Sequence, residues 1–131
     1  MAAENLLLCK TFNISSDYNN LSTALDQFTF VKVIGANFTV DQSVGSQSVE
    51  APIGITQESG KKGDGIAVGM VGISKLRLAG TVSAGQFINA TLGGEGVRHL
   101  GNGIAAAQAL QTGADNNVIE VLILSNFATA A

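Results

Sequence analysis

Two stretches near the middle of the chain decide the fold class: Ile66–Val71 (IAVGMV) and Ser74–Leu78 (SKLRL). In the second stretch, leucines alternate with Lys75 and Arg77, and alternation at every second residue is typical of a β-strand with one buried face. The first stretch is apolar, contains β-branched residues and is interrupted by a glycine. We therefore expect two short β-strands here, and the same pattern extends in both directions along the chain.

The other segments also favour strands over helices. The chain has 131 residues with 16 glycines and a single proline, and glycines spread among Val, Ile and Thr indicate short strands joined by tight turns. Further strands are predicted at Leu6–Ile14, Phe28–Ile34, Asn37–Val40, Ile53–Gln57, Phe87–Thr91, Val97–Leu100 and Val118–Leu124. The predicted fold is all-β: a compact β-sandwich or squat β-barrel, with a single domain at 20–131 and an N-terminal arm or first strand at 1–19.

The two halves of the chain repeat one another, which predicts an internal two-fold pseudo-repeat. A Gln-Phe pair opens a strand at Gln27 and again at Gln86, and each is followed later by a glycine, an aspartate and a β-rich run. These are Gly60, Asp64 and Ile66–Val71 in the first half, and Gly113, Asp115 and Val118–Leu124 in the second. The repeat places Ile104–Gln111 opposite Ile53–Gln57, so we predict a strand there although its alanines favour helix.

The composition favours a protein that assembles with others. Hydrophobic residues make up 46% of the chain and charged residues only 13%, so part of the surface is expected to be apolar and to bind another subunit. Phe28–Ile34 and Val118–Leu124 are apolar on both faces, which predicts a homo-oligomer, a trimer before a dimer. The net charge of −3 and the scattered lysines and arginines argue against nucleic acid and anionic membranes as partners.

No catalytic, cofactor-binding or metal-binding residues are predicted. The single cysteine, Cys9, follows three leucines and is expected to be a small buried hydrophobe, and the single histidine, His99, lacks the further ligands that a zinc site needs. The carboxylates are dispersed, and Asp64 and Asp115 follow turn glycines, where aspartate stabilises turns. The chain is therefore expected not to be an enzyme. A small β-barrel that binds a ligand remains an alternative.

The N-terminal segment is more apolar than a free tail. Its apolar run is too short for a signal peptide, so we expect a protein made and used without export. Such an arm should add a strand to a sheet, and we favour a contact with a sister subunit or a larger shell over a first strand of the same domain. The residues assigned to this interface are Leu6, Leu7, Leu8, Phe12, Ile14 and Tyr18.

The order of the segments resembles the capsid decoration proteins of tailed phages, also called cement or capsid-stabilising proteins. The resemblance covers roughly residues 20–125. It rests on an aromatic-Val-Lys strand within 25–33, an apolar-Gly-apolar-x-Gln segment at 53–57, a Gly-Asp turn with a Val-rich strand at 63–71, an Ala-Gly-x-Val-x-Ala-Gly run ending at Gly85, and an Ala-rich segment before a terminal Glu-Val-Leu strand at 105–124.

The resemblance implies a structural virion protein without catalytic residues or cofactors. Such a protein binds the outer surface of the phage capsid, contacts the major capsid protein and stabilises contacts between its subunits. Members are commonly trimers, and dimers also occur. The alternative is another phage structural piece, such as a tail, fibre or head-spike domain.

Overall fold

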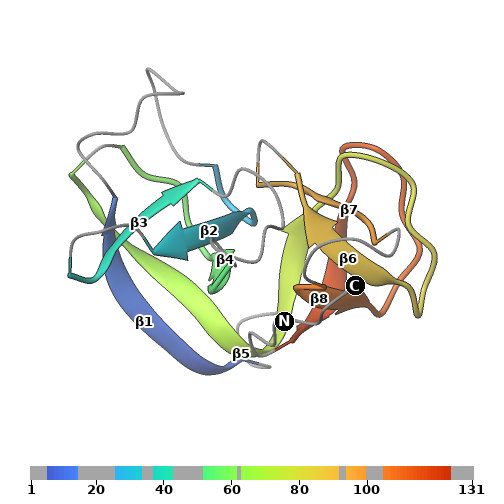
Figure 1. Ribbon diagram of the computed structural model, residues 1–131, viewed down its shortest axis with the longest axis horizontal. Coiled ribbons are helices and arrows are strands. Elements are labelled where there is room, and N and C mark those ends of the chain that lie inside the picture. Colours follow the sequence, from blue (N-terminus) through green and yellow to red (C-terminus); the bar gives the residue numbers. More distant parts are fainter. Residues whose placement is uncertain are drawn as a thin grey trace.

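The computed structural model of the chain describes residues 6–14, 26–33, 37–42, 52–61, 63–91, 94–99 and 105–124. These residues form strands joined by turns and contain no helix, which confirms the predicted all-β fold (Figure 1). The strands are β1 (Leu6–Ile14), β2 (Phe30–Val33), β3 (Thr39–Gln42), β4 (Gly54–Thr56), β5 (Gly65–Arg77), β6 (Phe87–Ala90), β7 (Gly96–Arg98), β8 (Ala107–Ala109) and β9 (Val118–Ile123).

The first half of the chain forms a closed five-stranded barrel. Its strands follow the order β1-β3-β2-β4-β5, and β5 pairs back with β1. β1 lies parallel to β3 and antiparallel to β5. Alternate side chains of these strands point inward and form one core cluster, which consists of Phe12, Ile14, Val31, Val40, Ile66 and Val68.

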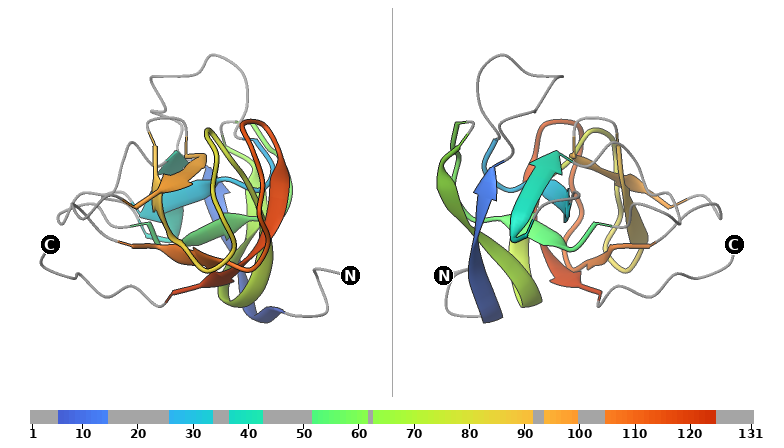
Figure 2. Two further views of the ribbon diagram at one scale, coloured as in Figure 1. Left: turned by 90° about the vertical axis from the view of Figure 1, so that its right-hand side faces the viewer. Right: turned by 60° about the vertical axis from the view of Figure 1, so that its left-hand side comes forward.

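The second half forms a similar barrel from β5, β9, β8, β6 and β7, in that order. This barrel closes through a parallel bridge between Leu78 and Gly96, and the N–H of Ala79 donates to the carbonyl of Gly96 at 2.8 Å. Its larger core includes Leu76, Leu78, Val82, Ile88, Ile119, Val121 and Ile123. Figure 2 shows the two barrels from two further directions.

Strand β5 belongs to both barrels. Its first part pairs with β1 and its second part pairs with β9, and Gly72 is the residue at which the two pairings meet. Gly72 has a φ of 111°, a conformation that is strained for a residue with a side chain. The two strands predicted from the sequence, Ile66–Val71 and Ser74–Leu78, are therefore the two halves of one strand that passes through this glycine, with Leu78 in the closing bridge.

The strand pairing confirms the internal repeat. β2, β3, β4 and β5 pair with one another in the same order and orientation as β6, β7, β8 and β9. The fifth strand of the first barrel is β1, and that of the second barrel is the C-terminal part of β5. Each fifth strand is antiparallel to the last strand of its set and meets the second strand of the set in parallel.

Single residues of the two barrels can be matched through their hydrogen bonds. The side-chain oxygens of Asp64 and Asn117 each accept a hydrogen bond from the backbone N–H three residues earlier, at 2.9 Å and 2.8 Å. The predicted match of Gly60 with Gly113 is thus correct, but Asp64 corresponds to Asn117 and not to Asp115. The spacing alone could not decide this, because the sequence match needs gaps.

The Ala-rich segment forms a strand, as the repeat predicted. β8 covers Ala107–Ala109 and lies between β6 and β9, in the place that β4 takes between β2 and β5 in the first barrel. Ala107 and Ala109 are buried, and their pairing partners on β9 are Ile123 and Val121. Tertiary pairing therefore overrides the helix preference of alanine, and Ile104 lies outside the described residues.

Gly60 and Gly113 offer a test of the repeat. A Cβ at Gly60 would lie 2.7 Å from Ile66 Cγ2, and a Cβ at Gly113 would lie 2.6 Å from Ile119 Cγ2. Gly60→Ala and Gly113→Ala should each lower the free energy of unfolding by ~1–3 kcal/mol, the usual cost of overpacking. Gly80→Ala is the matched control, because its nearest neighbour is Val97 Cγ1 at 4.0 Å. Urea denaturation measures all three. A loss at only one of Gly60 and Gly113 would contradict their equivalence, and an equal loss in Gly80→Ala would contradict overpacking as the cause.

Candidate interaction surface

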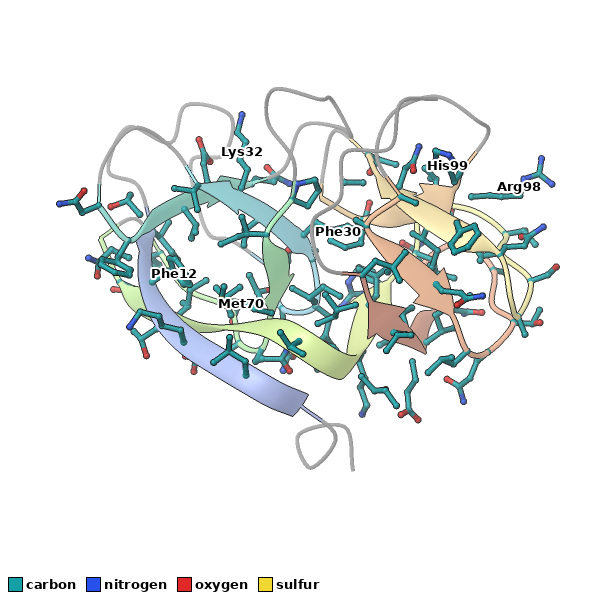
Figure 3. The ribbon with its side chains drawn as sticks, turned by 60° about the horizontal axis from the view of Figure 1, so that its bottom comes forward. Phe12, Phe30, Lys32, Met70, Arg98 and His99 are labelled. Atoms are coloured by element: carbon teal, nitrogen blue, oxygen red, sulfur yellow. The ribbon has the colours of Figure 1, made fainter. Side chains whose placement is uncertain are left out.

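The two barrels pack through an apolar row on the outside of the first. Strand pairing aligns Phe30 with Ile55, Ile55 with Gly69 and Gly69 with Cys9, so these four residues lie on one face. We call them the docked row; Phe30, Ile55 and Gly69 are buried, and Cys9 at the end of the row is exposed. Phe30 is only 1% exposed, and both it and Ile55 belong to the core cluster of the second barrel. Figure 3 shows Phe30 between the two barrels.

Hydrogen bonds fix this contact beside the place where the second barrel closes. Phe30 N–H donates to the Gly94 carbonyl at 2.7 Å, and Arg77 N–H donates to the Phe28 carbonyl at 2.9 Å. Gln57 Nε2 donates to Ser74 Oγ at 2.9 Å. The first barrel therefore covers the junction of β5 and β7, which we call the β5–β7 junction.

The second barrel carries an equivalent row, of which Phe87 and Leu122 are exposed and Gln108 and Ile73 are half-buried. Pairing aligns Phe87 with Gln108, Gln108 with Leu122 and Leu122 with Ile73, in the positions that correspond to Phe30, Ile55, Gly69 and Cys9. We call these four residues the open row. Phe87 is 48% exposed and Leu122 is 37% exposed. The open row is the candidate interaction surface, because large apolar side chains exposed together mark binding sites.

A second exposed feature lies where β1 meets β3, which we call the β1–β3 junction. Within the described residues these strands pair only at Asn13 and Ile14. The ring of Phe38 is 58% exposed beside this junction, and Lys10 Nζ lies 4.9 Å from its centroid. Phe38 has a φ of 48°, and a non-glycine residue in this region indicates strain that the surrounding structure must hold.

The structure places the residues that were assigned to an interface in different environments. β1 is a strand of the first barrel, and Phe12 and Ile14 point into its core. Their assignment to an interface is corrected, because burial within the same barrel accounts for their apolar side chains. Leu8 is exposed. The side chains of Leu6 and Leu7, and all of Tyr18, lie outside the described residues, so their role stays a prediction.

Phe38, Phe87 and Leu122 were not among the site residues predicted from the sequence. A signal existed for Leu122, because Val118–Leu124 is apolar on both faces. A signal for Phe87 was its match to a phenylalanine in the other half, although the correct partner is Phe30 and not Phe28. Phe38 carries no such signal in the sequence.

The described residues contain few arrangements of polar side chains that could catalyse a reaction or bind a metal ion. His99 Nδ1 lies 2.5 Å from Asn89 Oδ1, and Asp64 stabilises its turn. No group of three or more His, Cys, Asp or Glu side chains in the described residues is placed to hold a metal ion. An open hollow of about 410 Å³ beside the turn at 80–86 has one charged side chain in its lining, Arg98. That the protein is not an enzyme stays a prediction.

Cys9 is exposed, and the expectation that it is buried is wrong. Phe12 and Ile14 take the inward positions of β1, while Cys9, at the opposite parity, points outward. Partial desolvation raises the pKa of its thiol, and the nearby carboxylate of Glu58 raises it further. A raised pKa leaves little thiolate at neutral pH, which makes Cys9 a poor nucleophile.

Across the described residues there is no helix with the length and apolar character needed to cross a membrane.

Comparison with known proteins gives a likeness in structure. No protein-family model matches the sequence, and no characterised protein matches it significantly in sequence. The structure is similar to the N base of the head fiber protein gp8.5 of bacteriophage phi29, with a TM-score of 0.68. The alignment covers 92% of this chain and 97% of that one at 11% sequence identity. At this identity the likeness shows a shared fold.

Phe30 and Phe87 form a matched pair for mutation, because they hold equivalent positions in the two barrels. Phe30→Ala should lower the free energy of unfolding by ~3–5 kcal/mol, since it opens a cavity between the barrels. Phe87→Ala in the monomer should cost less than ~1 kcal/mol, the span of β-propensity effects. Denaturant unfolding at low protein concentration gives both values, and similar losses would show that Phe30 does not hold the barrels together.

The Cys9 thiol should titrate above the range of a free thiol. Its rate of alkylation as a function of pH should rise at a higher pH than that of an unstructured cysteine peptide. Glu58→Gln should move the rise to lower pH without reaching the peptide value, because desolvation is the larger cause. An unchanged profile in Glu58→Gln would rule out the carboxylate as a contributor.

Proposed function

We propose that this chain is a structural protein of a phage head. The observation that carries the proposal is the likeness to a phage head fiber base over nearly the whole of both chains. A chain with two barrels, few charges and exposed apolar rows suits a protein that binds other proteins repeatedly over a symmetric lattice, where weak contacts add up. The order of its sequence segments, which resembles capsid decoration proteins, supports the same proposal independently.

The proposed role is to bind the outer surface of the capsid and stabilise contacts between subunits of the major capsid protein. The protein acts there as a homo-oligomer, a trimer before a dimer, without cofactor, nucleic acid or membrane, and performs no catalysis. Its place is the outside of the virion, after synthesis in the host cytoplasm. The Leu6–Leu8 segment is a further candidate contact, because Leu8 is exposed.

A second candidate function is the base of a head fibre, favoured by the same structural likeness. The two functions differ in what the particle needs: a cement protein stabilises the shell itself, whereas a fibre base attaches another structure to it. The number of copies in purified particles also separates them, because hundreds of copies favour a shell protein and a few favour a fibre or spike.

Capsids prepared without this protein provide the test. The purified chain should sediment with them, reach saturation and raise the temperature at which they lose their contents. Saturable binding without any gain in capsid stability would favour the fibre base, and no binding at micromolar concentration would contradict both functions.

A further inference from the structure

Each side of the contact between the two barrels has an equivalent in the other barrel, and both equivalents carry exposed side chains. The docked row of the first barrel covers the β5–β7 junction, whereas the open row and the β1–β3 junction are exposed. We propose that the open row of one copy binds the β1–β3 junction of the next copy, head to tail. This contact goes beyond capsid binding, because it forms between copies of this chain alone.

The side chains of the open row match those by which the docked row packs onto the second barrel. In the docked row, Phe30 and Ile55 are buried by the second barrel. Their equivalents are Phe87 and Gln108, and Leu122 adds a large side chain where the docked row has Gly69. Leu110, 45% exposed, takes the place of Gln57, which contacts the β5–β7 junction. Aromatic side chains at the centre of a contact supply much of its binding free energy.

The β1–β3 junction of the first barrel corresponds to the β5–β7 junction of the second, onto which the docked row packs. Lys10 on β1 takes the place of Ser74 on β5, since their partners Val68 and Val121 are equivalent. Ser74 is buried because the first barrel covers it, whereas Lys10 is exposed. The side chain of Lys10 is thus uncovered at the position where Ser74 is covered. The backbone beside it is already paired, because Asn13 N–H, the counterpart of Arg77 N–H, donates to the Phe38 carbonyl at 2.8 Å, so the proposed contact rests on side chains.

A difference between the two junctions determines which residues would meet in the proposed contact between copies. Gly94 lies where the backbones approach closely, and a Cβ there would be 2.8 Å from the Phe30 carbonyl oxygen. The equivalent residue in the first barrel is Phe38, which also has a positive φ. A second copy therefore meets the Phe38 ring and not a bare backbone, so we infer an aromatic pair between Phe38 of one copy and Phe87 of the next.

Phe28 and Asn116 also have a positive φ, but among these three Phe38 is the one that holds a large apolar side chain mostly exposed, and the proposed contact would cover it. Glycine at this position, as in the second barrel, would avoid both the unfavourable φ and the exposure of a ring. Holding an exposed phenylalanine there has a cost in the monomer, and outliers of this kind gather at sites of function. A contact that joins two different surfaces is heterologous, so repeating it gives a closed ring or a chain.

Sedimentation of the full-length protein without capsids tests the proposal. The average mass of the wild type should rise with concentration from one chain to several. Phe87→Ser and Phe38→Gly should each remain monomeric over the same range, with thermal midpoints that show intact folding. Val118→Thr is the matched control: Val118 is exposed on β9 outside the open row, and this variant should associate like the wild type.

Mixing the two variants gives the sharpest result. Phe87→Ser keeps an intact β1–β3 junction and Phe38→Gly keeps an intact open row, so an equimolar mixture should form dimers and nothing larger. The proposal is overturned if the wild type is monomeric throughout, if the mixture stays monomeric, or if Val118→Thr also loses association. It is overturned as well if the open row binds capsids but not copies of this chain. Capsid binding by variants that cannot self-associate would leave the proposed function standing.

Discussion

The fold depends on Phe30 and Ile55 pointing out of one barrel and into the core of another. A barrel of five short strands buries little apolar surface by itself, and small domains have low stability for this reason. Sharing β5 and docking an outer row of one barrel onto the other gives the chain a core that neither half could build alone. The hydrogen bonds from Phe30 to Gly94 and from Arg77 to Phe28 fix the orientation of that contact.

This internal contact also explains why the surface is uneven. The two barrels are equivalent in topology, but among the described residues only one outer row and one junction pack against the other barrel. The remaining row and junction stay exposed and include Phe87, Leu122 and Phe38. The function proposed above, that of a structural protein of a phage head, needs surfaces for repeated contacts, and these exposed side chains are our candidates for them. In the two proposals, self-association and capsid binding use different parts of the same small chain.

The sequence predicted the fold further than it predicted the site. Strand positions, the repeat and the strand in the Ala-rich segment follow from periodicity and from the comparison of the two halves. Phe28–Ile34 was predicted to be apolar on both faces, and its described residues Phe28 and Phe30 pack against the second barrel of the same chain. No periodicity distinguishes such an internal partner from an external one. Phe12 and Ile14 were assigned to an interface for the same reason.

Phe38 shows most clearly what sequence cannot reveal. Its exposure and its positive φ arise from the turn before β3. Its candidate role was inferred by comparing it with Gly94, the residue at the equivalent position in the other barrel. The most direct measurement is a cryo-EM map of the assembled full-length protein in which aromatic rings are resolved. The map should show Phe87 of one copy within ~4 Å of Phe38 of its neighbour. A Phe87 ring that faces solvent, or that packs against Phe87 of another copy, would contradict the head-to-tail contact.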